Sequence, residues 1–147
     1  MRDIGRPYPI SHRTLYTVHQ RVADRYRVGR VLLAGDSAHL NNPLGGMGMN
    51  GGIHDAFNLA EKLSRVWHGE AGEAELDRYE RQRRSIALEY VNVLSIQNKK
   101  NLEAREPSER SRFREEMEGT AADPARARDC LLRISMIASL EKAAGII

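Results

Sequence analysis

Apolar residues recur at helical spacing over most of the chain after residue 52. Between Ile53 and Trp67 they fall on one helix face, and Gly69 and Gly72 are placed to end the helix. We expect this apolar stripe, Trp67 included, to face the core. The polar and charged side chains should then lie on the other faces: Asp55, Asn58, Glu61, Lys62 and Arg65.

A second helix is predicted from about Glu73 to Leu102. Its apolar stripe consists of Leu76, Tyr79, Ile86, Tyr90, Val93 and Leu94. Residues 103–122 are highly charged, and we expect one short exposed helix there, from about Ser108 to Glu118. Asp123 and Pro124 are a good helix start, with Asp as N-cap and Pro in the first turn. The last predicted helix runs from Pro124 to about Ala144, with Leu131, Ile134, Ile137 and Leu140 facing inward.

Strand patterns are few and lie in the first 34 residues. After an irregular lead-in over residues 1–13, Thr14 to Val22 alternates loosely, as in an edge strand. Val31–Ala34 is a short apolar run that Gly35 ends, typical of a strand buried on both faces of a parallel sheet. Such a strand needs neighbours, so its edges predict a homo-oligomer or a complementing chain. The fold class is therefore mainly α with a short β element.

Composition excludes several classes of protein. The 147 residues suffice for one domain, and the net charge of +3 spreads over many charges of both signs. Nucleic-acid binding is not indicated, because the sequence has no basic stripe with interleaved aromatic residues. The chain offers neither the roughly 18 continuous apolar residues of a membrane span nor the apolar core of a secretory signal. A single cysteine, Cys130, fits a reducing cytoplasm.

Residues 37–52 are dense in turn formers and carry the chemistry. Gly46-Met47-Gly48-Met49-Asn50-Gly51 matches G-x-G-x-x-G, but the strand ends about ten residues earlier, and the helix leads to another helix. An ordinary dinucleotide fingerprint is therefore not indicated. Glycines at a helix N-terminus still let unpaired N–H groups approach a flat or anionic group. On these residues alone, a glycine-rich turn that serves only tight packing explains the pattern equally well.

The wider segment resembles a known family. Residues 30–39 (RVLLAGDSAH) lead into residues 42–50 (NPLGGMGMN), and Asp55-Ala56, Asn58-Leu59 and Lys62-Leu63 follow. This is similar to the second flavin motif of the class A FAD-dependent aromatic monooxygenases, the para-hydroxybenzoate hydroxylase-like family. The phenol and hydroxyphenylpropionate hydroxylase branch is the most similar. The detailed match covers residues 21 to about 65, and Leu76-Tyr79-Glu80-Arg83-Arg84 looks like the family's next helix.

The resemblance assigns roles position by position. Gly35 and Asp36 match the strand end whose carboxylate binds the ribityl hydroxyls of FAD. Pro43 matches the catalytic-site proline beside the reactive edge of the isoalloxazine, where its fixed φ makes a rigid wall. The cofactor-binding loop matches Gly45, Gly46, Gly48, Met49 and Asn50. Its backbone would meet the pyrimidine end of the flavin, where a helix dipole favours the reduced anion.

The resemblance also implies a reaction. A nicotinamide cofactor, NADH or NADPH, would reduce FAD, O2 would react with the reduced flavin, and one oxygen atom would pass to a small, usually phenolic ring. The flavin supplies the chemistry, and the protein supplies position and water exclusion.

Other arrangements of these residues are less favoured. Asp36, Ser37 and His39 are too close in sequence for a hydrolase triad, and no nucleophile elbow is present. The spacing of His39, His54 and Asp55 fits no familiar metal site. We expect His39 to be a hydrogen-bonded structural histidine and Asp55 to cap or orient the start of the helix. The methionines, Met47 and Met49, either touch flavin or fill space.

Several parts of the family pattern are not found in this sequence. The family's strand–glycine loop–helix unit for the ADP half of FAD is not found, nor is its middle motif or substrate-site sheet. We expect a fragment of an FAD/NAD(P)-binding α/β domain: residues 1–29 returning from a substrate domain, residues 30–68 carrying the flavin loop, and residues 69–147 forming a helical region. The chain is then a fragment of a longer enzyme, a shortened product completed by another chain, or a non-catalytic helical interaction module that binds no flavin.

Overall fold

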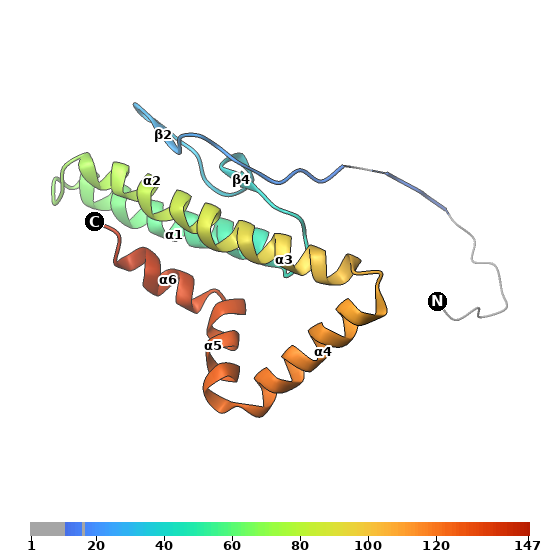
Figure 1. The fold of residues 1–147 in the computed structure, drawn as a ribbon. Coiled ribbons are helices and arrows are strands. Elements are labelled where there is room, and N and C mark those ends of the chain that lie inside the picture. Colours follow the sequence, from blue (N-terminus) through green and yellow to red (C-terminus); the bar gives the residue numbers. More distant parts are fainter. Residues whose placement is uncertain (1–10, 16) are drawn as a thin grey trace.

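Two long helices lying side by side form the body of the chain. The computed structural model describes residues 11–15 and 17–147. Helix α1 spans Met47–Trp67, and α2 (Ala74–Ile86) returns along it, continuing through the π-helical segment η2 (Ala87–Val91) into α3 (Asn92–Glu103) (Figure 1). The expected mainly α fold with a small β element is confirmed.

Helix α1 begins earlier than predicted. It starts at Met47 with Gly46 in the left-handed conformation at the N-cap, so several glycines assigned to the loop are helical. Glycine is a poor helix former, and tertiary packing overrides this preference here. The end at Trp67 is as predicted, and Gly69 follows with φ of 73°.

The apolar stripe of α1 was assigned to the wrong side. Phe57 and Trp67 are 76% and 86% exposed, whereas Asp55 and Lys62 are buried against the rest of the chain. The prediction that Trp67 belongs to the core is therefore wrong. Helical periodicity identifies an amphipathic face but not what covers it, and among the described residues nothing covers this one.

The π-helical segment rotates the buried face of the second helix. Before it, buried positions include Leu76, Tyr79 and Ile86; within it they are Ala87 and Val91, and after it the buried position is Ser95. The extra residue of a π turn shifts the following face by about 100°. Val93, predicted to be inward, is consequently exposed, and Ser95 takes the inner position.

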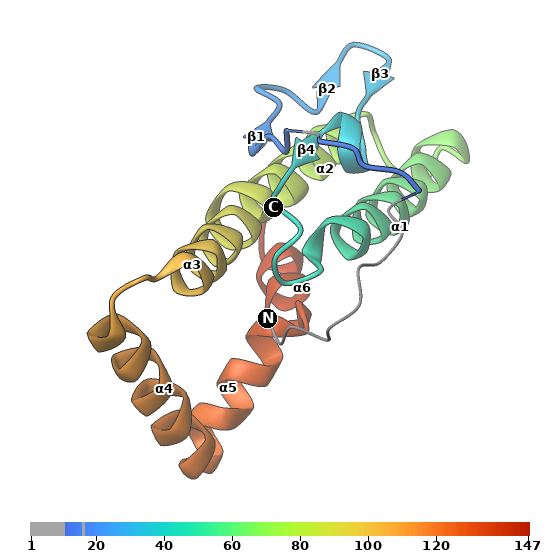
Figure 2. The same cartoon turned by 90° about the vertical axis from the view of Figure 1, so that its right-hand side faces the viewer.

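Three further helices follow. They are α4 (Pro107–Ala122), α5 (Pro124–Ile134) and α6 (Ile137–Ala144). The predicted exposed helix is confirmed, since α4 has no buried residue. In both views α4 and α5 extend away from the α1–α2 pair, and α6 returns to lie against α2 (Figures 1 and 2).

The last predicted helix is broken in two. Asp123 caps α5 as predicted, accepting hydrogen bonds from Ala125 N and Arg126 N at 2.9 and 3.2 Å. Met136 has a φ of 64°, which ends the helix and starts α6 in a new direction. The inward face proposed for this helix is wrong, because its residues are exposed: Leu131, Ile134, Ile137 and Leu140.

The strands form two short antiparallel pairs. β1 (Arg21–Val22) pairs with β4 (His39–Leu40), and β2 (Arg27–Val28) pairs with β3 (Val31–Leu32). The predicted parallel strand buried on both faces is therefore wrong, and Val31 is exposed. Its apolar run indicates a covered strand, but the described residues pair it only in a hairpin. Of the expected edge strand at 14–22, only Arg21–Val22 is a strand, and Tyr16 lies outside the described residues.

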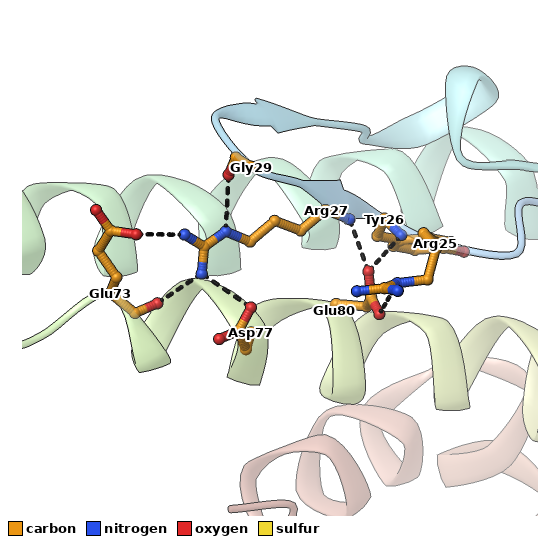
Figure 3. A network of polar contacts seen from close by, with 7 residues as sticks. All are labelled: Arg25, Tyr26, Arg27, Gly29, Glu73, Asp77 and Glu80. Carbon is orange, nitrogen blue, oxygen red and sulfur yellow. Dashed lines mark hydrogen bonds and ion pairs between the residues drawn. The ribbon is translucent and has the colours of Figure 1, made fainter.

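Polar contacts hold the β2–β3 hairpin on α2 (Figure 3). The Glu80 carboxylate accepts hydrogen bonds from the backbone N–H groups of Tyr26 and Arg27, both at 2.7 Å. The Arg27 guanidinium donates to Glu73 at 2.7 Å and to Asp77 at 2.8 Å. Tyr79 adds a hydrogen bond from its hydroxyl to Leu33 O at 2.6 Å. These contacts fix the β segment that leads into the turn at Asp36.

The core is small and lies in two clusters. One surrounds Tyr26 and Tyr79 beneath the hairpin, and the other surrounds Ile86 and Met136 between α2 and α6. Among the described residues, no helix is both long and apolar enough to cross a membrane.

Candidate functional site: the turn at Asp36 and the loop before α1

Asp36 lies exposed in a tight turn at the end of β3. The turn is a 3-10 helix, Gly35–Ser37, and Gly35 has a φ of 60°, which favours glycine. Ser37 closes the turn on itself: its hydroxyl donates to Ala34 O at 2.8 Å and accepts from Ala34 N at 3.2 Å. The Asp36 carboxylate takes no part in the hydrogen bonds and ion pairs among the described residues. It borders a shallow hollow lined by residues 21–24 and 36–40.

Glycines bring this turn against the start of α1. A β-carbon at Gly52 would lie 3.2 Å from the α-carbon of Gly35, and one at Gly51 would lie 3.2 Å from Cε1 of His39. Side chains at these two helical positions would therefore push α1 away from the turn. Because glycine has no β-carbon, α1 can approach the turn closely, and Asp36 lies beside the first turns of α1.

A buried carboxylate ties three segments together behind the turn. Asp55, on α1, is fully buried and accepts hydrogen bonds from Gly35 N at 3.0 Å, His39 Nε2 at 2.8 Å and Arg83 Nε at 2.6 Å. Arg83, on α2, also donates to Gly51 O at 3.4 Å. Burial alone would raise the pKa of Asp55, but the His39 hydrogen bond and the Arg83 charge and hydrogen bond outweigh it and lower the pKa.

Two overlapping turns shape the loop before α1. Asn42 Oδ1 accepts a hydrogen bond from Leu44 N at 3.1 Å, an Asx turn that spans Pro43. Pro43 O accepts from Gly46 N at 3.1 Å, and Gly45 and Gly46 have φ values of 106° and 65°. Pro43 itself is exposed, so its ring is presented at the surface of the loop.

Within the part of the chain that the structure describes, no side chain caps the N-terminus of α1. Because the helix begins at Met47, its free amides belong to Met47, Gly48 and Met49. A β-carbon at Gly46 would meet nothing within 4 Å, so this end is open to a neighbouring group. Asn50 turns back, and its Nδ2 donates to Gly46 O at 3.1 Å. Met47 is buried and Met49 is exposed.

The other candidate residues have structural partners. His39 is hydrogen-bonded to Asp55, as expected, and Ser37 is bonded to Ala34, so no triad runs through Asp36, Ser37 and His39. Asp55 orients the Asp36 turn and the start of α1 together. In the described part of the chain, no group of three or more His, Cys, Asp or Glu side chains is placed to hold a metal ion.

Sequence reasoning gave no role to Arg83, although it lies in the Leu76–Arg84 segment that resembles the family. The available signal was its spacing, since Arg83 lies four residues after Tyr79 and three before Ile86, on the apolar stripe of the predicted helix. Gln20 and Ser95, which contact the loop, were also missed because their partners lie more than 20 residues away.

The sequence is similar to known proteins. Residues 3–93 match the family model described as FAD binding domain. The para-nitrophenol 4-monooxygenase of a Pseudomonas species is 38% identical over 130 residues, which are 88% of this chain and 32% of that protein. The 3-(3-hydroxy-phenyl)propionate/3-hydroxycinnamic acid hydroxylase of Mycolicibacterium smegmatis is 45% identical over 94 residues, 61% of this chain and 17% of that protein.

Solved structures agree with the sequence relatives. The crystal structure of p-nitrophenol 4-monooxygenase from Pseudomonas putida superposes with a TM-score of 0.75 and 39% identity, covering 81% of this chain and 31% of that one. The flavin-dependent monooxygenase PieE in complex with FAD and substrate gives a TM-score of 0.56 and 28% identity, covering 89% and 23%. The chain thus spans about a third or less of the length of these relatives.

Proposed function

Because the chain belongs to the FAD binding domain family, within the class A flavin-dependent aromatic monooxygenases, we propose that it supplies the part of such an enzyme that holds the flavin ring and ribityl chain. The observation that carries the proposal is the convergence of the exposed Asp36 carboxylate with the N-terminus of α1, neither of which is bonded to a side chain among the described residues. The close approach of Gly35 and Gly52 brings the Asp36 turn and α1 side by side.

Each part of the site suits one part of the cofactor. The exposed Asp36 carboxylate accepts hydrogen bonds from hydroxyl groups, as the ribityl chain requires. The free amides of Met47, Gly48 and Met49, with Gly45, Gly46 and Asn50 beside them, face the electron-rich end of the ring. The helix dipole stabilises negative charge there by about 0.3–2 kcal/mol. Pro43, fixed between two turns, forms a wall at the reactive edge.

The proposed activity belongs to the whole enzyme. FAD, when bound, supplies the oxygen chemistry, and the enzyme uses NAD(P)H and O2 to hydroxylate a small phenolic substrate. The names of the relatives, which include a nitrophenol monooxygenase and a hydroxyphenylpropionate hydroxylase, support this substrate class. Within the chain we assign residues 30–68 to the flavin site, residues 1–29 to the return from the substrate domain and residues 69–147 to a helical region.

Riboflavin tests the proposal directly, because it carries the ring and the ribityl chain without the ADP half of FAD. We expect the purified chain to quench riboflavin fluorescence saturably and to shift the visible flavin band. Binding should be lost when Gly46 and Gly48 are both replaced by valine, because valine is strained at the left-handed Gly46 (φ of 65°) and both side chains would crowd the amides. A chain that keeps its helical circular dichroism but binds neither riboflavin nor FAD would instead favour the non-catalytic helical module.

The exposed apolar residues support a proposal about assembly. Ile53, Phe57 and Trp67 are exposed along α1, and Leu131 and Ile134 are exposed on α5. Exposed apolar side chains gathered on one face of a helix often mark an interaction surface. We expect the chain to form a homo-oligomer or to associate with a complementing chain. Sedimentation velocity should show species heavier than 16.6 kDa, and a monodisperse monomer would contradict this expectation.

A further inference from the structure

We propose that Asn42 is a positioning residue of the flavin loop, which acts through an amide latch formed with Gln20 and Ser95. The inference rests on the proposed function, because the loop it positions is the one assigned to the flavin. It goes beyond the family resemblance, because it assigns a set of hydrogen bonds that fixes the position of Pro43 through the preceding residue.

Asn42 uses both ends of its side-chain amide. Its Oδ1 accepts from Leu44 N at 3.1 Å, and its Nδ2 donates to Gln20 Oε1 at 2.9 Å and to Ser95 O at 3.0 Å. The backbone carbonyl of Ser95 only accepts, so Nδ2 must face it. Aspartate, which has the same shape, would therefore keep the turn over Pro43 but lose both donated hydrogen bonds.

Gln20 extends the latch to the second long helix. Its Nε2 donates to Ser95 Oγ at 2.8 Å and to Asn92 Oδ1 at 3.2 Å. Ser95 is fully buried. It faces inward because the π-helical segment Ala87–Val91 displaces the register of α3 by one residue. A regular α-helix would place a different residue opposite the loop, so the π segment is what brings Ser95 into contact with Gln20 and Asn42.

The same helix contacts the loop at a second point. Asn98 Nδ2 donates to Leu44 O at 3.4 Å, and a β-carbon at Gly45 would lie 2.7 Å from that nitrogen. Thus α3 supports residues 42–45, whereas Pro43 and the α1 N-terminus remain exposed for a ligand. Because Pro43 directly follows Asn42, any shift of the latch moves the proposed wall against the flavin ring.

Asn42→Asp, Asn42→Ala and Ser95→Ala test the latch, with Gln97→Ala as a matched control. Gln97 lies on the exposed side of α3, and its side chain donates to Asn101 at 2.7 Å, away from the loop. We expect the test variants to speed amide hydrogen exchange at Leu44 and Gly46 and to weaken riboflavin binding about three- to tenfold, the worth of one or two hydrogen bonds. Gln20→Ala combined with Asn42→Ala should weaken binding no more than the stronger single change.

Two results separate this inference from the proposed function. Exchange at Leu44 and Gly46 that matches the Gln97→Ala control would overturn the latch, even if riboflavin binds. Failure of the unmodified chain to bind riboflavin would count against the proposed function, while the exchange measurement would still decide the latch. Unchanged visible spectra of riboflavin bound to the Asn42 variants would also overturn it, because a displaced wall must alter the surroundings of the ring.

Discussion

Replacing Arg83 with alanine is expected to destabilise the chain by about 3–5 kcal/mol, the cost of leaving a buried charge without its partner. The Arg83 and Asp55 side chains are 2% and 0% exposed, and they approach to 2.6 Å. Loss of the guanidinium leaves Asp55 with only His39 and the Gly35 amide. Urea unfolding followed by circular dichroism measures the change.

Arg25→Ala is the matched control, because it also removes an arginine from an ion pair. Arg25 pairs with Glu80 at 3.3 Å but is 68% exposed, so its loss should cost less than about 1 kcal/mol. If Arg83→Ala does not fold, Arg83→Lys, which keeps a positive charge but has a shorter reach, should still unfold at a lower urea concentration than Arg25→Ala. Equal midpoints would refute the central role of the buried pair.

The pH dependence of stability reports on the same pair. The pKa of Asp55 is lowered in the folded chain, so its contribution is present above the unfolded value and is lost as pH falls through the folded value. Taking the unfolded pKa as about 3.9, we expect stability to decline from about pH 5 downwards. In Asp55→Asn this part of the acid dependence should disappear, and stability should already be low at pH 7.

Asp36→Ala is expected to weaken riboflavin binding about ten- to a hundredfold, because hydrogen bonds to a charged group are worth about 1.5–3 kcal/mol. Lumiflavin has the same ring but lacks the ribityl chain, so its affinity should change little. Fluorescence titration of both ligands measures the difference. Asp36 is exposed and pairs with no other group in residues 11–15 and 17–147, so the variant should keep the stability of the unmodified chain.

Asp24→Ala is the companion control, since Asp24 is also exposed and borders the same shallow hollow. It lies in a different segment and should leave riboflavin binding unchanged. If Asp36→Ala loses affinity for riboflavin and for lumiflavin equally, the carboxylate contacts the ring rather than the ribityl chain. No loss for either ligand would remove Asp36 from the site.

Much of the architecture could be predicted because local signals determine it. The glycines after Trp67, the Asp123 cap and the length of the second helix are consequences of neighbouring residues, and each is found as expected. The turn at Asp36 and the glycine-rich loop were also recognisable, because strand end, Gly-Asp and Pro-Gly-Gly follow at a fixed spacing.

The rest depends on contacts that periodicity does not encode. Gly48, Gly51 and Gly52 are read as loop residues from propensity, yet all three are helical. Gly51 packs against His39 and Gly52 against Gly35, contacts that no local pattern encodes. Asp55 was assigned to an outer face because it is charged, but its three donors come from 16 to 28 residues away. The register change in η2 leaves no mark in the apolar pattern, so neither Ser95 nor its contacts with the loop could be foreseen.

The exposure of Trp67 has a practical consequence. It is the single tryptophan in the sequence and lies 86% exposed at the end of α1. Its indole emission should therefore be that of a water-surrounded ring, and it should move to shorter wavelength when another surface covers this face. The chain thus carries a built-in optical reporter of assembly that needs no label and can be followed in the absence of flavin.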